Sequence, residues 1–169
     1  MNIKKIKIFF IDVDGVLTDG TLLYIEDKFY RSFNIKDGIG FHLLKLGSIE
    51  PVVISAKFSK ETEKRCEELN VEFYSTEENK LETIQQILEK KGYSWEETGY
   101  IGDDIPDIPV MKKVSFSATP SDAPEEVKKI ADFVCKNKGG DGAFREVVEF
   151  ILKEQEKWDV VLRKFLCME

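Results

Sequence analysis

The sequence has a single histidine, His42, and only three cysteines in 169 residues. Sites built from several histidines, such as many zinc and iron centres, are therefore excluded, as is any Ser-His-Asp triad that does not use His42. The cysteines Cys66, Cys135 and Cys167 form no Cys-x-x-Cys pair and lack a metal-type spacing. Their low and odd number indicates a reduced protein, so we expect it in the cytoplasm.

The sequence also lacks a long apolar run and an excess of positive charge. The apolar segment 8–11 is far shorter than the core of a signal peptide, and no segment reaches the length of a membrane span. Acidic residues outnumber basic ones 32 to 25, which gives a net charge of −7. This balance argues against nucleic acid and against an anionic membrane surface as partners. An anionic substrate then needs a metal ion or a local cluster of bases.

The length predicts one domain over residues 1–169, large enough to bury a core without disulfides. Predicted strands lie at 5–11, 51–55, 71–74, 100–102, 114–117 and 133–135. Predicted helices lie at 37–47, 59–69, 79–91, 108–112 and 124–130, with a last one from 143. The alternation predicts an α/β fold with a doubly wound, Rossmann-like parallel sheet.

Three segments carry further structural predictions. Polar residues 26–28 separate two strand-like runs and predict a β-hairpin. Asp37 is predicted to cap the first helix, which Gly47 can end. Apolar positions continue at helical spacing from Phe144 to Phe165. That last helix has more apolar residues than a small domain should expose, so its tail either folds back on the core or forms a subunit interface; we favour the interface.

Polar side chains follow the predicted strands where each strand ends. They are Asp12, Asp14, Ser55, Lys57, Asp103, Asp104 and Asp107, and Lys80 opens the helix after 71–74. The carboxyl ends of parallel strands meet at one edge of a sheet, so these side chains should converge there. Crowded carboxylates repel one another unless a cation lies between them. Oxygen ligands without histidine or cysteine point to Mg²⁺.

Carboxylates, Mg²⁺, a lysine and a hydroxyl are the groups that phosphoryl transfer requires. The cations neutralise the phosphate so that an anionic nucleophile can approach, and the hydroxyl binds a non-bridging oxygen. One aspartate can form an aspartyl phosphate. A second carboxyl two residues further on can protonate the leaving alkoxide and then deprotonate the attacking water.

Four motifs carry a resemblance to a known family. Residues 12–20 (DVDGVLTDG) resemble the nucleophile motif of the haloacid dehalogenase superfamily of phosphohydrolases, and Ser55, Lys80 and 102–107 (GDDIPD) match its other motifs in order. Within the superfamily, segments 33–40, 102–111 and 139–146 resemble a capless branch that acts in lipopolysaccharide precursor synthesis. That branch hydrolyses 3-deoxy-D-manno-octulosonate 8-phosphate, a small sugar-acid phosphate. The resemblance covers about residues 5–152.

The resemblance implies roles for individual residues. Asp12 would be the nucleophile and Asp14 the acid/base, while Ser55 and Lys80 would hold the phosphoryl oxygens. Mg²⁺ would be held by Asp12, the main-chain carbonyl of Asp14 and Asp103, with Asp104 beside them. Positions that the family uses for its substrate are Asp14, Asn34, Lys36, Asp37, Gly38, His42, Lys57, Arg65 and Lys80. The family also implies a homotetramer, with a hairpin flap at about 20–34 replacing a cap domain. Subunit contacts would help to close the site, and a helical tail occupies about 153–169.

Three departures from the family pattern concern the sugar. The second motif usually reads Thr-Gly-Arg and is Ser55-Ala56-Lys57 here, which keeps a charge but loses the bidentate guanidinium. Position 42 is often arginine and is histidine here, and the usual Gln-Gly before the motif lysine is missing from 75–80. A phosphatase for a sialic-acid-type 9-phosphate is therefore an alternative.

Two other classes of protein are compatible with parts of the pattern. A signalling receiver also combines aspartates, a hydroxyl and a lysine around Mg²⁺. Its phosphoacceptor aspartate follows a later strand, however, where this chain has Ser55. A non-catalytic relative kept for oligomerisation would have no physical reason to retain the carboxylate cluster. The glycines at 139, 140 and 142 lack a following Gly-Lys-Ser/Thr and predict a turn near the site.

Overall fold

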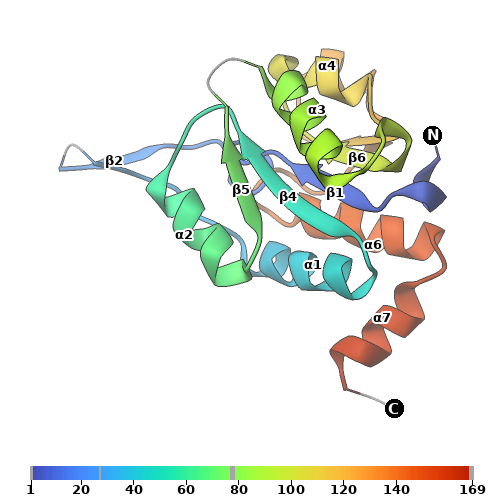
Figure 1. The fold of residues 1–169 in the computed structure, drawn as a ribbon. Coiled ribbons are helices and arrows are strands. Elements are labelled where there is room, and N and C mark those ends of the chain that lie inside the picture. Colours follow the sequence, from blue (N-terminus) through green and yellow to red (C-terminus); the bar gives the residue numbers. More distant parts are fainter. Residues whose placement is uncertain (1, 27, 77–78, 168–169) are drawn as a thin grey trace.

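A six-stranded parallel sheet forms the centre of the computed structural model, which describes residues 2–26, 28–76 and 79–167 (Figure 1). Its strand order is β5-β4-β1-β6-β7-β8. The strands are β1 (Ile8–Ile11), β4 (Glu50–Ser55), β5 (Glu72–Ser75), β6 (Thr98–Ile101), β7 (Phe116–Thr119) and β8 (Phe133–Val134). Every neighbouring pair is parallel, so the predicted doubly wound fold is confirmed.

Helices cover both faces of the sheet (Figure 1). They are α1 (Ile35–Leu46), α2 (Lys60–Leu69), α3 (Lys80–Lys91), α4 (Ile108–Met111), α5 (Glu125–Lys128), α6 (Ala143–Glu154) and α7 (Trp158–Phe165), with 3-10 turns η1 (Ile3–Lys5), η2 (Trp95–Glu97) and η3 (Ile105–Asp107). Alternate residues of β1 supply both cores: Phe9 and Ile11 pack toward α1 and α6, and Ile8 and Phe10 pack toward α3 and α4. Because β1 is buried on both faces, its end is fixed at the middle of the sheet.

Two helices begin where they were predicted, and the cap predicted for a third is wrong. Ser59 caps α2 by accepting the N–H of Thr62, and Asn79 caps α3 by accepting the N–H groups of Leu81 and Glu82. The prediction that Asp37 caps α1 is wrong, because Asn34 does so by accepting the N–H of Lys36 at 2.9 Å. Asp37 lies inside the first turn and accepts the N–H of Arg145 at 2.9 Å, which ties α1 to α6.

The predicted continuous last helix is also wrong, because the structure divides it. Helix α6 ends at Glu154, and Glu156 takes a left-handed conformation (φ 58°) before α7 begins. The side-chain amide of Gln155 donates to the carbonyls of Ile3 and Ile6, which favours the break at this point. Helix α7 then folds back, burying Val161 against the core and leaving Val160, Phe165 and Leu166 exposed. Residues 168–169 of the predicted tail lie outside the described residues.

A two-stranded hairpin projects from the sheet edge at which the strands end (Figure 1). Its strands β2 (Leu23–Ile25) and β3 (Lys28–Tyr30) pair antiparallel within the predicted hairpin segment, and Asp27 in the predicted turn lies outside the described residues. The described residues of both strands are exposed. An apolar hairpin is therefore left exposed by the part of the chain that the structure describes. Among residues 2–26, 28–76 and 79–167, no helix is long and apolar enough to cross a bilayer.

Candidate active site

The loop after β1 places Asp12 at the centre of the sheet edge. Asp12 donates its N–H to the carbonyl of Ile101 at 3.0 Å, which continues the pairing of β1 with β6. The next turn is tight, because the carbonyl of Val13 accepts the N–H groups of Val16, Leu17 and Thr18 at 2.9–3.3 Å. Asp12 is only 6% exposed. Its carboxylate is therefore held in one place at the bottom of the site.

Two close approaches require glycine around this loop. A Cβ on Gly15, which has φ 83°, would lie 1.9 Å from Oδ2 of Asp103, so only glycine lets the Asp103 loop come so near. A Cβ on Gly139 would lie 1.9 Å from the carbonyl oxygen of Gly15. Gly140 donates its N–H to the carbonyl of Val16 at 2.9 Å. The predicted turn of glycines thus packs directly on the Asp12 loop.

A buried lysine joins two carboxylates beneath the site. Nζ of Lys80 lies 2.7 Å from Oδ1 of Asp12 and 2.6 Å from Oδ1 of Asp107. The Tyr100 hydroxyl donates to the same Asp107 oxygen at 2.5 Å. The other oxygen of Asp107 accepts the N–H groups of Asp103 and Asp104 at 2.9 and 3.2 Å. Asp107 therefore fixes both Lys80 and the Asp103 loop, a role that the sequence did not predict.

The carboxylates of Asp12, Asp103 and Asp107 lie together, with one oxygen from each within 4.8 Å of the others. Both oxygens of Asp107 already accept hydrogen bonds, so Asp12 and Asp103 are the members of this cluster that could hold a metal ion. Burial, reinforced by Asp107, raises the pKa of Asp12 to about 7 against the opposing effect of Lys80. Burial, followed by the charge of Asp12, raises the pKa of Asp103 to about 8. Bringing these groups together costs free energy that a cation recovers. An all-oxygen donor set suits a hard divalent ion such as Mg²⁺.

A cavity of about 400 Å³ opens above these carboxylates. The predicted site residues that line it are Asp12, Asp14, Ser55, Lys57, Lys80, Asp103 and Asp104. Ser55 ends β4, and its hydroxyl accepts the N–H of Lys57 at 3.3 Å. The convergence predicted for the carboxyl ends of the strands is thus present in one cavity.

Arg31, just beyond β3, lines the same cavity and was not predicted. Its Nε lies 2.6 Å from Oδ1 of Asp14 and its Nη2 lies 2.9 Å from Oδ2. The contact joins residues 17 positions apart through the hairpin, and the spacing of the sequence contains no signal for it. Asp14 thus points toward the hairpin and is absent from the cluster formed by Asp12, Asp103 and Asp107.

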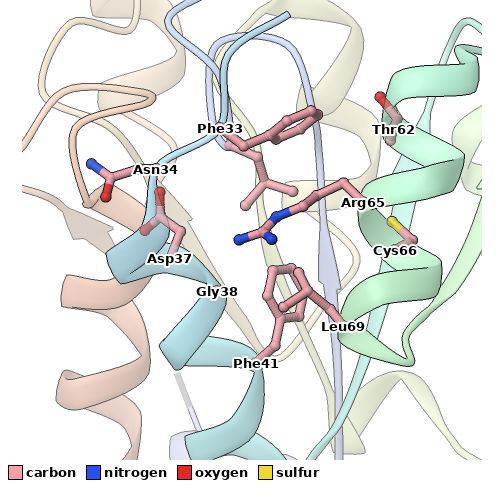
Figure 2. A pocket seen from close by; sticks show the side chains of 10 residues that line it. Phe33, Asn34, Asp37, Gly38, Phe41, Thr62, Arg65, Cys66 and Leu69 are labelled. Carbon is pink, nitrogen blue, oxygen red and sulfur yellow. The ribbon is translucent and has the colours of Figure 1, made fainter.

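Six other predicted substrate positions do not line this cavity. Asn34, Asp37, Gly38 and Arg65 line a separate small pocket between α1 and α2 (Figure 2), whereas Lys36 and His42 are exposed on α1. In Figure 2 the guanidinium of Arg65 reaches across to α1, and a Cβ on Gly38 would lie 2.6 Å from its Nη2. The absence of a side chain at Gly38 makes room for Arg65.

Asp37 in this pocket is expected to make stability depend on pH. One of its oxygens has no hydrogen-bond partner in residues 2–26, 28–76 and 79–167, and burial raises its pKa from 3.8 to about 6. The folded state therefore holds this proton more tightly than the unfolded state, so stability falls as pH rises from about 4 through 6. The loss levels off above about pH 6, where Asp37 is ionised in both the folded and the unfolded state.

Asp37→Asn cannot ionise and should therefore be more stable than the parent chain at pH 7.5 but not at pH 4.5. Urea unfolding at both pH values measures the difference. Asp159→Asn, at an exposed position of α7, is the matched control and should show no pH-dependent gain. A difference for Asp37→Asn that stayed constant with pH would contradict the effect of burial.

The fold and site together define a class of protein. A doubly wound sheet presents Asp12 after β1, Ser55 after β4, Lys80 after β5 and Asp103 after β6, which is the arrangement of an aspartate-dependent phosphohydrolase. A family model described as haloacid dehalogenase-like hydrolase matches residues 52–147.

Comparison with individual proteins narrows the class. The 3-deoxy-D-manno-octulosonate 8-phosphate phosphatase of Escherichia coli K12 is 37% identical over 92% of this chain and 84% of its own length. A structure of the Moraxella catarrhalis phosphatase with magnesium, phosphate and KDO has a TM-score of 0.92 at 31% identity and covers 97% of this chain and 95% of that one. The cobalt-bound Haemophilus influenzae phosphatase has a TM-score of 0.90 at 35% identity, covering 95% of both chains.

The chain belongs to the haloacid dehalogenase-like hydrolases and, within them, to the family of 3-deoxy-D-manno-octulosonate 8-phosphate phosphatases. This membership excludes the signalling receiver, whose phosphoacceptor aspartate follows a different strand.

Proposed function

We propose that this chain is a Mg²⁺-dependent phosphomonoesterase that hydrolyses 3-deoxy-D-manno-octulosonate 8-phosphate to the free sugar acid and phosphate. The observation that carries the proposal is the position of Asp12, which lies against Lys80 at the bottom of a cavity shared with Ser55 and Asp103. Its relatives in Escherichia coli and Moraxella catarrhalis support the choice of substrate.

The proposed reaction has two displacement steps. A carboxylate oxygen of Asp12 attacks phosphorus, the bond from phosphorus to the sugar oxygen breaks, and Asp14 donates a proton to that oxygen. Water then attacks the aspartyl phosphate while Asp14 takes its proton, which releases phosphate and restores Asp12. Lys80 and the Ser55 hydroxyl hold the non-bridging oxygens, and Lys80 offsets the negative charge that collects on them.

Mg²⁺ would be held by the carboxylates of Asp12 and Asp103 and the main-chain carbonyl of Asp14, with exposed Asp104 beside them. Bound there, the ion supplies charge that lets an anionic nucleophile meet an anionic phosphate. The crowding supports this assignment, because burial and mutual repulsion raise the pKa values of Asp12 and Asp103 and a bound cation would relieve that repulsion.

We further propose that the protein is a cytoplasmic homotetramer formed from single phosphatase domains, with the hairpin acting as a flap. The exposed apolar residues of β2 and β3 support an assembly, and so do Val160, Phe165 and Leu166 at α7.

Three free cysteines support a reducing compartment. In such an assembly Asn34, Lys36, Asp37, Gly38, His42 and Arg65 would reach substrate with the help of subunit contacts. Sedimentation equilibrium giving only monomer would refute the tetramer.

Phosphate release from a panel of esters tests the activity. The panel contains the eight-carbon sugar-acid phosphate, a sialic-acid-type 9-phosphate, hexose phosphates and p-nitrophenyl phosphate, each with Mg²⁺ and with chelator. We expect Mg²⁺-dependent turnover of the eight-carbon substrate well above that of the others. Preference for the 9-phosphate would transfer the assignment to that alternative. If only p-nitrophenyl phosphate is hydrolysed, the phosphatase activity is retained and the assigned substrate is wrong. If the folded protein hydrolyses none of the esters, the chain is better described as a non-catalytic relative.

A further inference from the structure

Arg31 is the only arginine among the described residues that line the catalytic cavity. Its side chain is 4% exposed, and its guanidinium lies 5.1 Å from the ring centroid of Phe29 on the hairpin. Two of its donors, Nε and Nη2, are taken by Asp14. The third nitrogen, Nη1, is buried and has no hydrogen-bond partner among the described residues. The guanidinium is thus built into the site with one donor group unused.

The ion pair with Arg31 restrains Asp14, for which we propose the role of acid/base. Both carboxylate oxygens of Asp14 accept hydrogen bonds from the one guanidinium. Each oxygen keeps a second lone pair, but the bidentate guanidinium fixes the direction in which the carboxylate points. Opening the pair would let Asp14 turn toward the leaving alkoxide and toward the attacking water. Asp14 is 40% exposed, so water can solvate its carboxylate once Arg31 leaves.

A second carboxylate is the group best suited to draw Arg31 away. The planar guanidinium fork matches carboxylate geometry, which the ammonium group of a lysine does not. Lys57 occupies the position of the motif arginine. Arg31 is therefore the residue of the described cavity lining whose guanidinium could bind a substrate carboxylate in a bidentate manner. The phosphoryl group is already served by Lys80 and Ser55. The carboxylate of a sugar acid is the remaining anionic group of the substrate.

We propose that Arg31 determines specificity for acidic sugar phosphates by changing partners. Its guanidinium moves from the carboxylate of Asp14 to the carboxylate of the substrate, and this exchange releases Asp14 for proton transfer. The inference rests on the proposed function and extends it, because it makes recognition of the sugar acid a condition for freeing the acid/base.

Steady-state kinetics of Arg31→Gln and Arg31→Lys tests the exchange. The substrates are the eight-carbon sugar-acid phosphate, a hexose phosphate without a carboxylate and p-nitrophenyl phosphate. For Arg31→Gln, kcat/KM on the acidic substrate should fall at least ten-fold, mainly through KM, whereas kcat on the two esters without a carboxylate should stay the same or rise, because Arg31 no longer holds Asp14. Arg31→Lys should recover part of that loss, because it retains a cation. Lys129→Gln removes a cation at an exposed position just after α5 and is the control.

Equal losses on all three substrates would overturn the proposal, because they would mean a structural role or contact with the phosphoryl group. No loss on the acidic substrate would overturn it equally. A second readout does not require turnover of the acidic ester: free 3-deoxy-D-manno-octulosonate should inhibit p-nitrophenyl phosphate hydrolysis by the parent chain, and at least ten-fold more weakly in Arg31→Gln. If the parent chain does not hydrolyse the acidic ester yet shows this inhibition, the proposed substrate is wrong and Arg31 binds a sugar-acid carboxylate without the release of Asp14. Equal inhibition of both chains would refute the exchange.

Discussion

Asp12→Asn is expected to lower kcat for phosphate release by about 1000-fold or more, because the neutral amide oxygen cannot act as the nucleophile. The fold should survive this change. Asp12 is a buried carboxylate whose pKa is raised to about 7 by burial and by Asp107, so removing its charge relieves repulsion. In the presence of chelator, thermal unfolding of Asp12→Asn should therefore occur at the same temperature as the parent chain or higher.

Two measurements on the same samples separate this outcome from simple misfolding. Phosphate release with Mg²⁺ reports the chemistry, and thermal unfolding with chelator reports the fold. Asp159→Asn changes the same residue type at an exposed position of α7 and should leave both unaffected. If the kcat of Asp12→Asn is within ten-fold of that of the parent chain, Asp12 is not the nucleophile and the mechanism through an aspartyl phosphate on Asp12 is refuted.

Lys80→Met should damage both activity and stability. The side chain of Lys80 is 8% exposed and contacts Asp12 and Asp107, so its removal leaves two buried carboxylates without their cation. Breaking a buried ion pair from one side costs about 3–5 kcal/mol of unfolding free energy. Without the positive charge of Lys80, the negative charge on the phosphoryl oxygens is no longer offset, and kcat/KM should fall by about 100-fold or more. Urea unfolding and phosphate release measure the two effects.

A double variant gives the sharper comparison. Lys80→Met with Asp107→Asn removes one of the stranded charges, while an asparagine oxygen can still accept the N–H groups of Asp103 and Asp104. Stability should return toward the parent value, whereas activity should stay low. Added Mg²⁺ should also stabilise the single variant, because the ion replaces part of the missing positive charge. Recovery of activity in the double variant would show that Lys80 serves the fold alone.

The sheet was predictable because its signals are local. Apolar runs alternate with amphipathic ones, and Ser59, Asn79 and Gly92 mark helix ends with side-chain and backbone chemistry that acts over a few residues. The break between α6 and α7 was not predictable in this way. Apolar spacing continues across it, no glycine or proline marks it, and the contacts that favour it reach from Gln155 to the carbonyls of Ile3 and Ile6.

Some residues of the candidate site were likewise predictable from the sequence, and others were not. Asp12, Ser55, Lys80 and Asp103 converge because parallel strands bring their carboxyl ends together, a consequence of topology that follows from strand order. Asp37 was mistaken for a helix cap because asparagine and aspartate compete for that position, and Asn34 occupies it. Arg31 was missed because its partner depends on how far the hairpin bends back, which the pattern of residues does not encode.

The packing of Gly139 and Gly140 against the Asp12 loop has a consequence for synthesis. Asp12 leaves the ribosome early, but β6, which flanks β1, ends at residue 101, and the turn that covers the carbonyls of Gly15 and Val16 arrives only at residue 140. A nascent chain therefore carries its reactive carboxylate through most of translation without the loop that fixes it. We therefore expect a shortened product of interrupted synthesis that ends before residue 140 to lack a fixed nucleophile.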